Sequence, residues 1–298
     1  MKERRLTRRV ALKTMGVAVA TAALAACGGP APISVTTPVA LPRFAPDSYM
    51  QVIQDRGQLI AGINTDVRLF GFSDPNIKGD PDKGFDVDIA REIARAIFGS
   101  PDRLQIKEMT SAARIPSLKE DLVDLVAATM TITKARLQQV DFSDVYYESA
   151  QMILVPKNSA IKGIHDTAGK RVCAAKGSTS IDNITRLEPR AVPVQTIGWL
   201  DCLDAVHQGK ADAISTDDVI LMGLANQDPN QVLLQEKLTQ EPYGIAIAQG
   251  RSGFLDFVNA VLSDLKKNGR WAQIHEHWLG PYLPTPAPPT RTARDAAV

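Results

Sequence analysis

Apolar runs and amphipathic segments alternate through the middle of the chain. In FDVDIAREIARAIFG (85–99) the apolar residues recur at helical spacing, and Gly99 is a typical helix end. Short apolar runs such as QLIAGIN (58–64) and KRVCAAK (170–176) predict buried strands instead. Further strands are predicted at 104–109, 123–129, 151–156, 192–197, 211–215 and 243–248, and helices at 115–122, 200–209, 216–227 and 254–269. The alternation predicts an α/β fold with mainly parallel sheets between about residues 48 and 280.

The stretch ATMTITKAR (128–136) departs from this pattern. Thr129, Thr131 and Thr133 alternate with apolar residues, so their hydroxyls lie on one face of a strand end. Arg136 follows this strand end. An exposed edge strand that runs into a loop with a surface arginine would look the same. The alternative is a pocket for a small carboxylate, because a guanidinium can donate two parallel hydrogen bonds to one carboxylate.

Two segments share one order of elements. SLKEDLVDLVAATMTITKAR (117–136) runs from a helix through a strand into a polar loop, and DAVHQGKADAISTDDVIL (204–221) does the same. Two similar lobes of this kind would each present a polar loop at the carboxyl end of a strand. Open α/β sheets bind ligands at that edge, so the pattern predicts a ligand cleft between two lobes.

The first 26 residues have the pattern of an export signal. A basic region precedes the apolar run GVAVATAALAA (16–26), which is too short to cross a bilayer, and small residues come before Cys27. The sequence LAAC that ends at Cys27 resembles a bacterial lipobox, in which the cysteine becomes the lipidated first residue. A cysteine that merely lies within the apolar run is the alternative. The pattern predicts a lipoprotein signal peptide over residues 1–26.

The route of export stays open. TRRVALK (7–13) resembles a twin-arginine signal, but Ala11 stands where phenylalanine is usual, so the general route is equally compatible with it. Loss of residues 1–26 removes six basic residues and one acidic residue, which changes the formal charge from +1 to about −4.

Two proline-rich segments flank the predicted folded body. Residues 27–47 are rich in Pro, Ala, Gly and Thr, which predicts an extended tether between the lipid and the fold. The C-terminal run PYLPTPAPPTRTARDAAV (281–298) has a similar composition and is predicted to be an unstructured tail.

Two cysteines remain in the body, Cys173 and Cys202. An exported chain folds in an oxidising compartment, where an even number of cysteines favours a disulfide. Two buried thiols that pack as small hydrophobic groups are the alternative. Their spacing matches neither a zinc site nor a CxxC redox motif.

Composition excludes other classes of function. The near-neutral charge without a basic stripe argues against nucleic-acid binding. No phosphate-binding glycine loop is present, so we expect no cofactor. His275 and His277 are two residues apart and would not share a helix face, so we expect no metal site there.

Four segments, in this order along the chain, carry a resemblance to a known family. They are GFDVDIAREIARAI (84–97), TMTITKARLQQVDFSDVYY (129–147), GKRVCAAKGSTS (169–180) and ADAISTDD (211–218). Together they resemble the family 3 extracellular solute-binding proteins, the polar amino-acid receptors of bacterial importers. The lipobox, the cysteine pair and the proline-rich tail look most like actinobacterial glutamine- or glutamate-binding lipoproteins.

The resemblance implies a two-lobed fold of the type II periplasmic-binding-protein kind. Its two α/β lobes would be joined by two crossing hinge strands, at about 146–153 and 242–248. Lobe 1 would then comprise residues 48–147 and 245–280, and lobe 2 residues 148–244.

The resemblance also implies roles for residues that would hold the α groups of an amino acid. Arg136 would bind the α-carboxylate, helped by the backbone N–H of Thr131. Ser178 and Thr179, where a helix begins, would form a second anion contact, although a helix cap without a ligand is the alternative. Asp217 would bind the α-ammonium group, or else cap the helix that follows it. Thr129 would assist Asp217.

The side chain of the ligand would be recognised by other residues. TSAARIP (110–116) resembles a segment of aspartate- and glutamate-binding members, in which Ser111 and Arg114 would hold the second carboxylate. A helix-start serine and a solvated arginine are the alternative. Asn64 stands where an aspartate would favour basic ligands. Phe70 would pack on the methylene groups of the ligand, or lie in the core.

These residues predict an amino-acid-binding lipoprotein on the outer face of the cell membrane. We expect a monomer that binds glutamate or aspartate, with glutamine or asparagine as the alternative, and closes like a hinge. Its partner would be the permease of an ABC importer or a membrane sensor. The remaining alternative is a dehydratase on the same fold, for which only Asp217 could act as general acid or base. We therefore expect no enzymatic activity.

Overall fold

The computed structural model describes residues 42–74 and 76–298. The predicted signal peptide (1–26), the predicted lipidation site Cys27 and most of the predicted tether lie outside these residues. No helix in the described part of the chain is long and apolar enough to cross a lipid bilayer.

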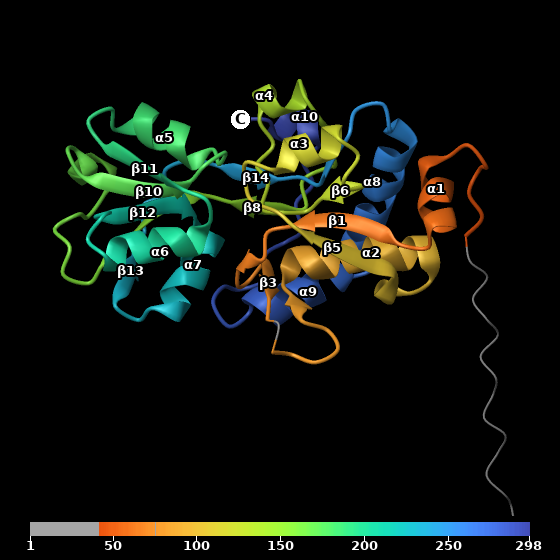
Figure 1. Ribbon diagram of the computed structural model, residues 1–298, viewed down its shortest axis with the longest axis horizontal. Helices are drawn as coiled ribbons and strands as arrows, with labels where there is room; N and C mark the ends of the chain where they lie inside the picture. The colour runs from red at the N-terminus through yellow and green to blue at the C-terminus, as the bar shows by residue number, and fades with distance from the viewer. Residues whose placement is uncertain (1–41, 75) are drawn as a thin grey trace, which may run out of the picture. The chain divides into compact units, whose positions relative to one another are not determined.

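Two five-stranded sheets organise the fold, and each defines a lobe (Figure 1). The lobe 1 sheet has the order β5-β1-β6-β15-β7, and the lobe 2 sheet has the order β11-β10-β12-β9-β13. The lobe 1 strands are β1 (Leu59–Ile63), β5 (Leu104–Glu108), β6 (Leu125–Val126), β7 (Asp141–Phe142) and β15 (Ala246–Ile247). The lobe 2 strands are β9 (Gln151–Pro156), β10 (Arg171–Ala175), β11 (Val192–Thr196), β12 (Ala213–Asp217) and β13 (Gln231–Leu233).

Parallel pairs form the centre of each sheet. Strand β1 pairs in parallel with β5 and β6, and β10 pairs in parallel with β11 and β12. Antiparallel strands complete both sheets, with β15 beside β6 and β7 and with β9 beside β12 and β13. The carboxyl ends of the parallel strands in the two lobes carry the polar loops that the sequence pattern placed there.

Helices cover both faces of each sheet. In lobe 2, α6 and α7 lie on one face of the sheet and α5 on the other (Figure 1). The lobe 2 helices are α5 (Ser180–Leu187), α6 (Trp199–His207) and α7 (Asp218–Gln227), with the short helix η2 (Ile164–Thr167). The lobe 1 helices are α1 (Tyr49–Arg56), α2 (Phe85–Phe98), α3 (Arg114–Lys119), α4 (Lys134–Leu137), α8 (Ser252–Lys267), α9 (Arg270–Leu279) and α10 (Ala293–Ala296), with η1 (Pro101–Arg103).

Helix α2 shows how local sequence fixes these elements. It begins after Gly84, whose φ of 133° places it in the region that favours glycine, and a Cβ there would lie 2.2 Å from the carbonyl oxygen of Phe70. Asp86 and Asp88 lie in its first turn, where the helix dipole favours negative charge. Gly99 ends the helix in the left-handed conformation, as the sequence predicted.

Two short strands connect the lobes. Strand β8 (Tyr147–Ser149) pairs antiparallel with β14 (Glu241–Tyr243) in a separate two-stranded sheet. The chain leaves lobe 1 through β8 and returns through β14, so these are the crossing strands that the resemblance implied. A third small sheet comprises β2 (Asp66–Val67), β3 (Gly71–Ser73) and β4 (Asp82–Lys83). The fold is therefore the two-lobed type II arrangement.

An aromatic cluster surrounds the hinge strands and joins them to lobe 1. The ring of Phe70 lies 4.9 Å from that of Tyr147 and 5.9 Å from that of Tyr243, measured between centroids. Phe70 is fully buried in this cluster. The structure thus places Phe70 in the core and not against a ligand.

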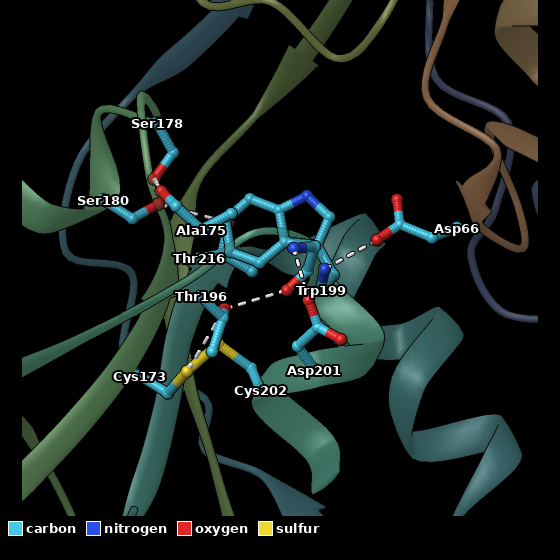
Figure 2. Close-up of a disulfide and its surroundings, with 11 residues drawn as sticks. Asp66, Cys173, Ala175, Ser178, Ser180, Thr196, Trp199, Asp201, Cys202 and Thr216 are labelled. Atoms are coloured by element: carbon cyan, nitrogen blue, oxygen red, sulfur yellow. Dashed lines mark hydrogen bonds between the residues drawn. A yellow bond between two sulfur atoms is a disulfide. The ribbon is translucent and has the colours of Figure 1, made fainter. Parts of the chain in front are cut away.

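The predicted disulfide is present. Cys173 in β10 and Cys202 in α6 are bonded through their sulfur atoms (Figure 2). The bond closes a loop of 29 residues within lobe 2. Cross-linking such a loop lowers the entropy of the unfolded chain and so stabilises the fold. The bond also ties α6 to β10.

The prediction of an unstructured C-terminal tail is wrong. Residues 284–298, which we call the C-terminal strap, pack along lobe 1. The carbonyl of Arg291 accepts a hydrogen bond from the N–H of Val145, and Val298 exchanges backbone hydrogen bonds with Ile132 and Lys134. Arg291 also pairs with Glu148 on hinge strand β8, at 2.5 Å.

Small residues of the strap complete part of the core. Ala293 and Ala296 on α10 are buried against an apolar cluster that includes Phe142 and Val145. Proline-rich composition suggested disorder, but proline also lowers the entropy that the chain loses on ordering. The apolar surface and unpaired backbone groups of lobe 1 supply the compensating contacts.

The predicted tether is also shorter than its composition suggested. Phe44 packs edge-on against Phe257, with ring centroids 5.4 Å apart, and the carbonyl of Pro42 accepts a hydrogen bond from Gln54. The described fold therefore includes residues 42–47.

Deletion of residues 284–298 tests the strap. We expect the melting temperature to fall by roughly 5 °C or more, because the deletion uncovers the apolar cluster and removes backbone hydrogen bonds. The single variant Arg291→Ala is the control and should cost less, because it removes only a half-exposed ion pair. Differential scanning calorimetry measures both, and an unchanged melting temperature after the deletion would show that the strap contributes nothing.

Candidate functional site

A narrow cavity lies between the lobes, at the carboxyl ends of the central strands. Its lining residues from lobe 1 are Ser111, Arg114, Thr129, Thr131 and Arg136, and those from lobe 2 are Ser178, Thr179, Ser180, Trp199, Thr216, Asp217 and Ile220. Eight of the ten residues predicted to bind the ligand therefore lie together. The accessible space is about 10 Å³, close to that of one water molecule. An amino acid can enter only when the lobes separate.

Arg136 projects over the cavity from the short helix α4. Thr133 caps this helix by accepting the N–H of Arg136 at 3.1 Å. Within lobe 1 the guanidinium Nη1 donates to the carbonyl of Thr131 at 2.7 Å, and across the cleft Nη2 donates to the carbonyl of Gly177 at 3.1 Å. Burial lowers the pKa of Arg136, an effect that Glu241 opposes. This desolvated cation is suited to a carboxylate ligand.

Arg114 lies beside Arg136 and is buried, with only 3% of its surface exposed, whereas Arg136 is partly exposed. Its Nε donates to the carbonyl of Ser111, and its Nη1 donates to the carbonyl of Ala128 at 3.0 Å. Its Nη2 donates to the carbonyl of Gly177, as Arg136 does. Burial, followed by the neighbouring charge of Arg136, lowers the pKa of Arg114 to about 9. The alternative of a solvated surface arginine is thereby excluded.

The two arginines differ in the donors that they leave for a ligand. Bonds within lobe 1 occupy Nε and Nη1 of Arg114, so only its Nη2 faces the other lobe. Among the described residues, the guanidinium of Arg136 makes one hydrogen bond within its own lobe, through Nη1. Its Nε and Nη2 are therefore available for two parallel bonds when the lobes separate.

Thr129 adopts a strained backbone conformation beside these arginines. Its φ is 43°, which is uncommon for a β-branched residue. The conformation points its N–H to the carboxylate of Asp86 at 2.9 Å, and the hydroxyl of Tyr146 donates to the same carboxylate. Burial raises the pKa of Asp86 to about 7. Strain that surrounding contacts maintain is typical of functional sites.

Glu241 on hinge strand β14 connects the site to the hinge. It accepts hydrogen bonds from the hydroxyl of Thr131 in lobe 1 at 2.7 Å and from that of Thr179 in lobe 2 at 2.9 Å. Asn183 of helix α5 donates to its other oxygen. In this closed arrangement both threonine hydroxyls therefore donate to the hinge strand through Glu241.

Asp217 is the anionic group of the cavity. It ends β12, and its Oδ2 accepts a hydrogen bond from the hydroxyl of Tyr243 at 2.6 Å. It makes no side-chain cap to α7, whereas Asp218 accepts the N–H of Val219. Within residues 42–74 and 76–298, Oδ1 of Asp217 is buried without a hydrogen-bond partner. Burial raises the pKa of Asp217 well above its usual value, so an approaching cation would stabilise the carboxylate.

A tight turn brings lobe 2 against the arginines. Gly177 has a φ of 83°, and a Cβ there would lie 2.7 Å from the Cα of Ala112 in lobe 1. Ser178 bonds back to the carbonyl of Ala175, and Ser180 donates to the hydroxyl of Thr216. The turn therefore requires glycine both for its conformation and for the close approach of the lobes.

Asn64 lies near this cavity but does not line it. It faces an adjoining cavity of about 250 Å³, which shares Ser111 and Trp199 with the first. Phe70, the other predicted residue outside the lining, lies in the core as described above.

Sequence reasoning missed Trp199, Thr216 and Ile220, which also line the cavity. Trp199 is the first residue of α6, directly after the loop that follows β11. The rule that ligands lie beyond the carboxyl ends of parallel strands would have found it, because strand and helix were both predicted there.

Comparison with known proteins places this geometry in a family. Residues 59–281 match the bacterial extracellular solute-binding proteins, family 3. The chain belongs to this family.

Relatives within family 3 support the assignment. The ABC transporter glutamine-binding protein GlnH of Bacillus subtilis (strain 168) is 41% identical over 231 residues, which are 77% of this chain and 84% of that protein. A solved mutant of the arginine-binding protein ArgBP of T. maritima has a TM-score of 0.72 at 33% identity, over 78% of this chain and 99% of that one. An ancestral arginine-binding protein bound to glutamine has a TM-score of 0.70 at 35% identity, over 76% and 99% of the two chains.

Proposed function

We propose that this family 3 protein is an amino-acid receptor that delivers its ligand to the permease of an ABC importer. The observation that carries the proposal is the free, buried Oδ1 of Asp217 in the same cavity as the guanidinium of Arg136. One is suited to an α-ammonium group and the other to an α-carboxylate. A dissociation constant of ~1 μM corresponds to only about 8 kcal/mol, so the groups must be held in place before the ligand arrives.

The donors of Arg114 bear on the side chain of the ligand. Only its Nη2 faces the opposite lobe, and one of its two N–H groups already donates to the carbonyl of Gly177, so one N–H remains for a single oxygen acceptor. An amide oxygen meets that requirement, whereas a carboxylate gains most from a two-pronged donor. GlnH of Bacillus subtilis, the relative with 41% identity, is named as a glutamine-binding protein. We therefore place glutamine first among the ligands.

Glutamate and aspartate, the ligands expected from the sequence, form the second candidate. Two guanidiniums share the buried cavity, and a second negative charge on the ligand would offset the second of them. A cationic side chain would be repelled by the same pair. Arginine is therefore a poor candidate, although several similar structures are those of arginine-binding proteins.

A thermal-shift and calorimetric screen of amino acids tests the function. Glutamine should give the largest rise in melting temperature, glutamate and aspartate smaller ones, and lysine and arginine none, because a ligand stabilises only the state that binds it. Arg136→Ala should abolish every shift. Arg186→Ala is the matched control, because this exposed arginine lies outside the small cavity. A largest shift with lysine or arginine would contradict the assignment of the side-chain site.

We also propose that the protein is exported and anchored by lipid at Cys27. The signal-like residues 1–26 and the lipobox support this. Radiolabelled palmitate fed to producing cells should enter the protein, and Cys27→Ser should lose the label and release the protein into the medium. Labelling that persists in the Cys27→Ser variant would refute anchoring at this residue.

A further inference from the structure

Trp199 carries a buried hydrogen-bond donor that none of the described residues accepts. Its side chain is 2% exposed, and in the described part of the chain its indole Nε1 has no hydrogen-bond partner. The other two tryptophans are satisfied, since Nε1 of Trp271 donates to the carbonyl of Tyr146 and that of Trp278 donates to Asp88, each at 2.8 Å. A buried donor without a partner costs about 1–3 kcal/mol, so its retention in a cavity points to a ligand.

Contacts at the start of helix α6 hold the indole of Trp199 in place. Helix α6 is tied to β10 by the disulfide, and Thr196 donates to the carbonyl of Gly198 at 2.9 Å. Figure 2 shows the ring of Trp199 rising from this first turn, with Thr216 and Ser180 near it. The donor is therefore positioned before any ligand enters.

We propose that the indole N–H of Trp199 donates to the terminal oxygen of the ligand side chain. The inference rests on the proposed function and deepens it. Trp199 and Arg114 line the same cavity from opposite lobes, so an amide or carboxylate oxygen can accept from both. An apolar side chain would leave the indole donor unpaired, which selects against it.

Nuclear magnetic resonance of the indole groups tests the contact directly. The ¹⁵N-labelled protein should show three indole N–H signals, one for each tryptophan. On titration with glutamine the signal of Trp199, assigned from Trp199→Phe, should move downfield. The signals of Trp271 and Trp278 are internal controls and should stay in place. If glutamine binds and the Trp199 signal does not move downfield, this inference fails and the receptor function stands; if no amino acid binds, the receptor function fails.

A comparison of two ligands distinguishes the contribution of the indole N–H to affinity from that of the aromatic ring. Trp199→Phe keeps an aromatic ring and removes the N–H. It should raise the dissociation constant for glutamine about tenfold, which corresponds to about 1.4 kcal/mol of binding free energy. L-norvaline, which lacks the terminal amide, should bind both proteins equally in competition calorimetry. If the substitution lowered the affinity for both ligands equally, or left the affinity for glutamine unchanged, Trp199 would contribute through packing of its ring alone.

A separate contact joins the backbone of Trp199 to the other lobe. The carboxylate of Asp66 in lobe 1 accepts the N–H of Trp199 in lobe 2 at 2.6 Å (Figure 2). Gly198, at the N-cap of α6, has no side chain to cap the helix. A Cβ at Gly198 would lie 2.6 Å from Oδ2 of Asp66, so the absence of a side chain also admits this carboxylate. Helix α6 is thus capped by the opposite lobe.

The geometry points to Asp66 as a positioning residue that stabilises the closed form without touching the ligand. The contact joins two lobes that must separate for entry, so it exists only after closure. Its contribution should therefore appear in ligand affinity and in the fraction of closed molecules, not in the stability of the ligand-free protein.

Three variants test this role. Asp66→Ala should raise the dissociation constant for glutamine about fivefold, and small-angle scattering should show less compaction on binding. Gly198→Ala should do the same by obstructing Asp66, and it leaves lobe 1 unaltered. Asp201→Ala is the control, because Asp201 caps α6 from within lobe 2. It should lower the melting temperature of the ligand-free protein and leave the affinity within about twofold. Normal affinity in both Asp66→Ala and Gly198→Ala would overturn the inference.

Discussion

Two guanidiniums share one backbone carbonyl across the cleft, and this contact joins the lobes in the closed arrangement. Arg114 and Arg136 come from lobe 1, and the carbonyl of Gly177 comes from lobe 2. Two adjacent cations in a buried site are costly unless dipoles or anions offset them. Backbone carbonyls of lobe 1 supply part of the offset. An incoming carboxylate would offset more of this positive charge, so a bound anionic group would stabilise the site.

The hinge and the site are parts of one polar network. Glu241 and Tyr243 lie on the same hinge strand, and they bond Thr131, Thr179 and Asp217. Opening the cleft must rearrange these bonds, while the aromatic cluster behind them keeps the hinge packed on lobe 1. Opening of the cleft would therefore change the bonds of the hinge and those of the site together.

The disulfide and the C-terminal strap support the two lobes on either side of the cleft. The disulfide fixes α6 on its sheet in lobe 2, and the C-terminal strap covers one face of lobe 1 and pairs with Glu148 beside the hinge. With each lobe supported in this way, movement of one lobe relative to the other would take place at the cleft. These supports also explain why the first turn of α6 can present Trp199 with a fixed orientation, since ligand recognition improves when the donors are ordered in advance.

Local sequence determined the elements and most of the site. Periodicity located α2 and the central strands, and the alternation of polar residues at a strand end drew attention to Thr131 and Arg136. The family resemblance supplied Asp217. Composition was a weaker guide. The proline-rich strap packs because lobe 1 offers it apolar surface and backbone partners, which its own sequence does not reveal.

Only the tertiary structure decided which side chains share one cavity. It separated Phe70 from the ligand site, buried Arg114 beside Arg136, and brought Trp199 from lobe 2 and Asp66 from lobe 1 to the start of one helix. The physical reason is that contacts across the cleft join residues from 41 to 133 positions apart, and no short-range pattern of polarity records them. The sequence by itself therefore determined the two lobes and their polar loops, while the packing of one lobe against the other decided how those loops are used.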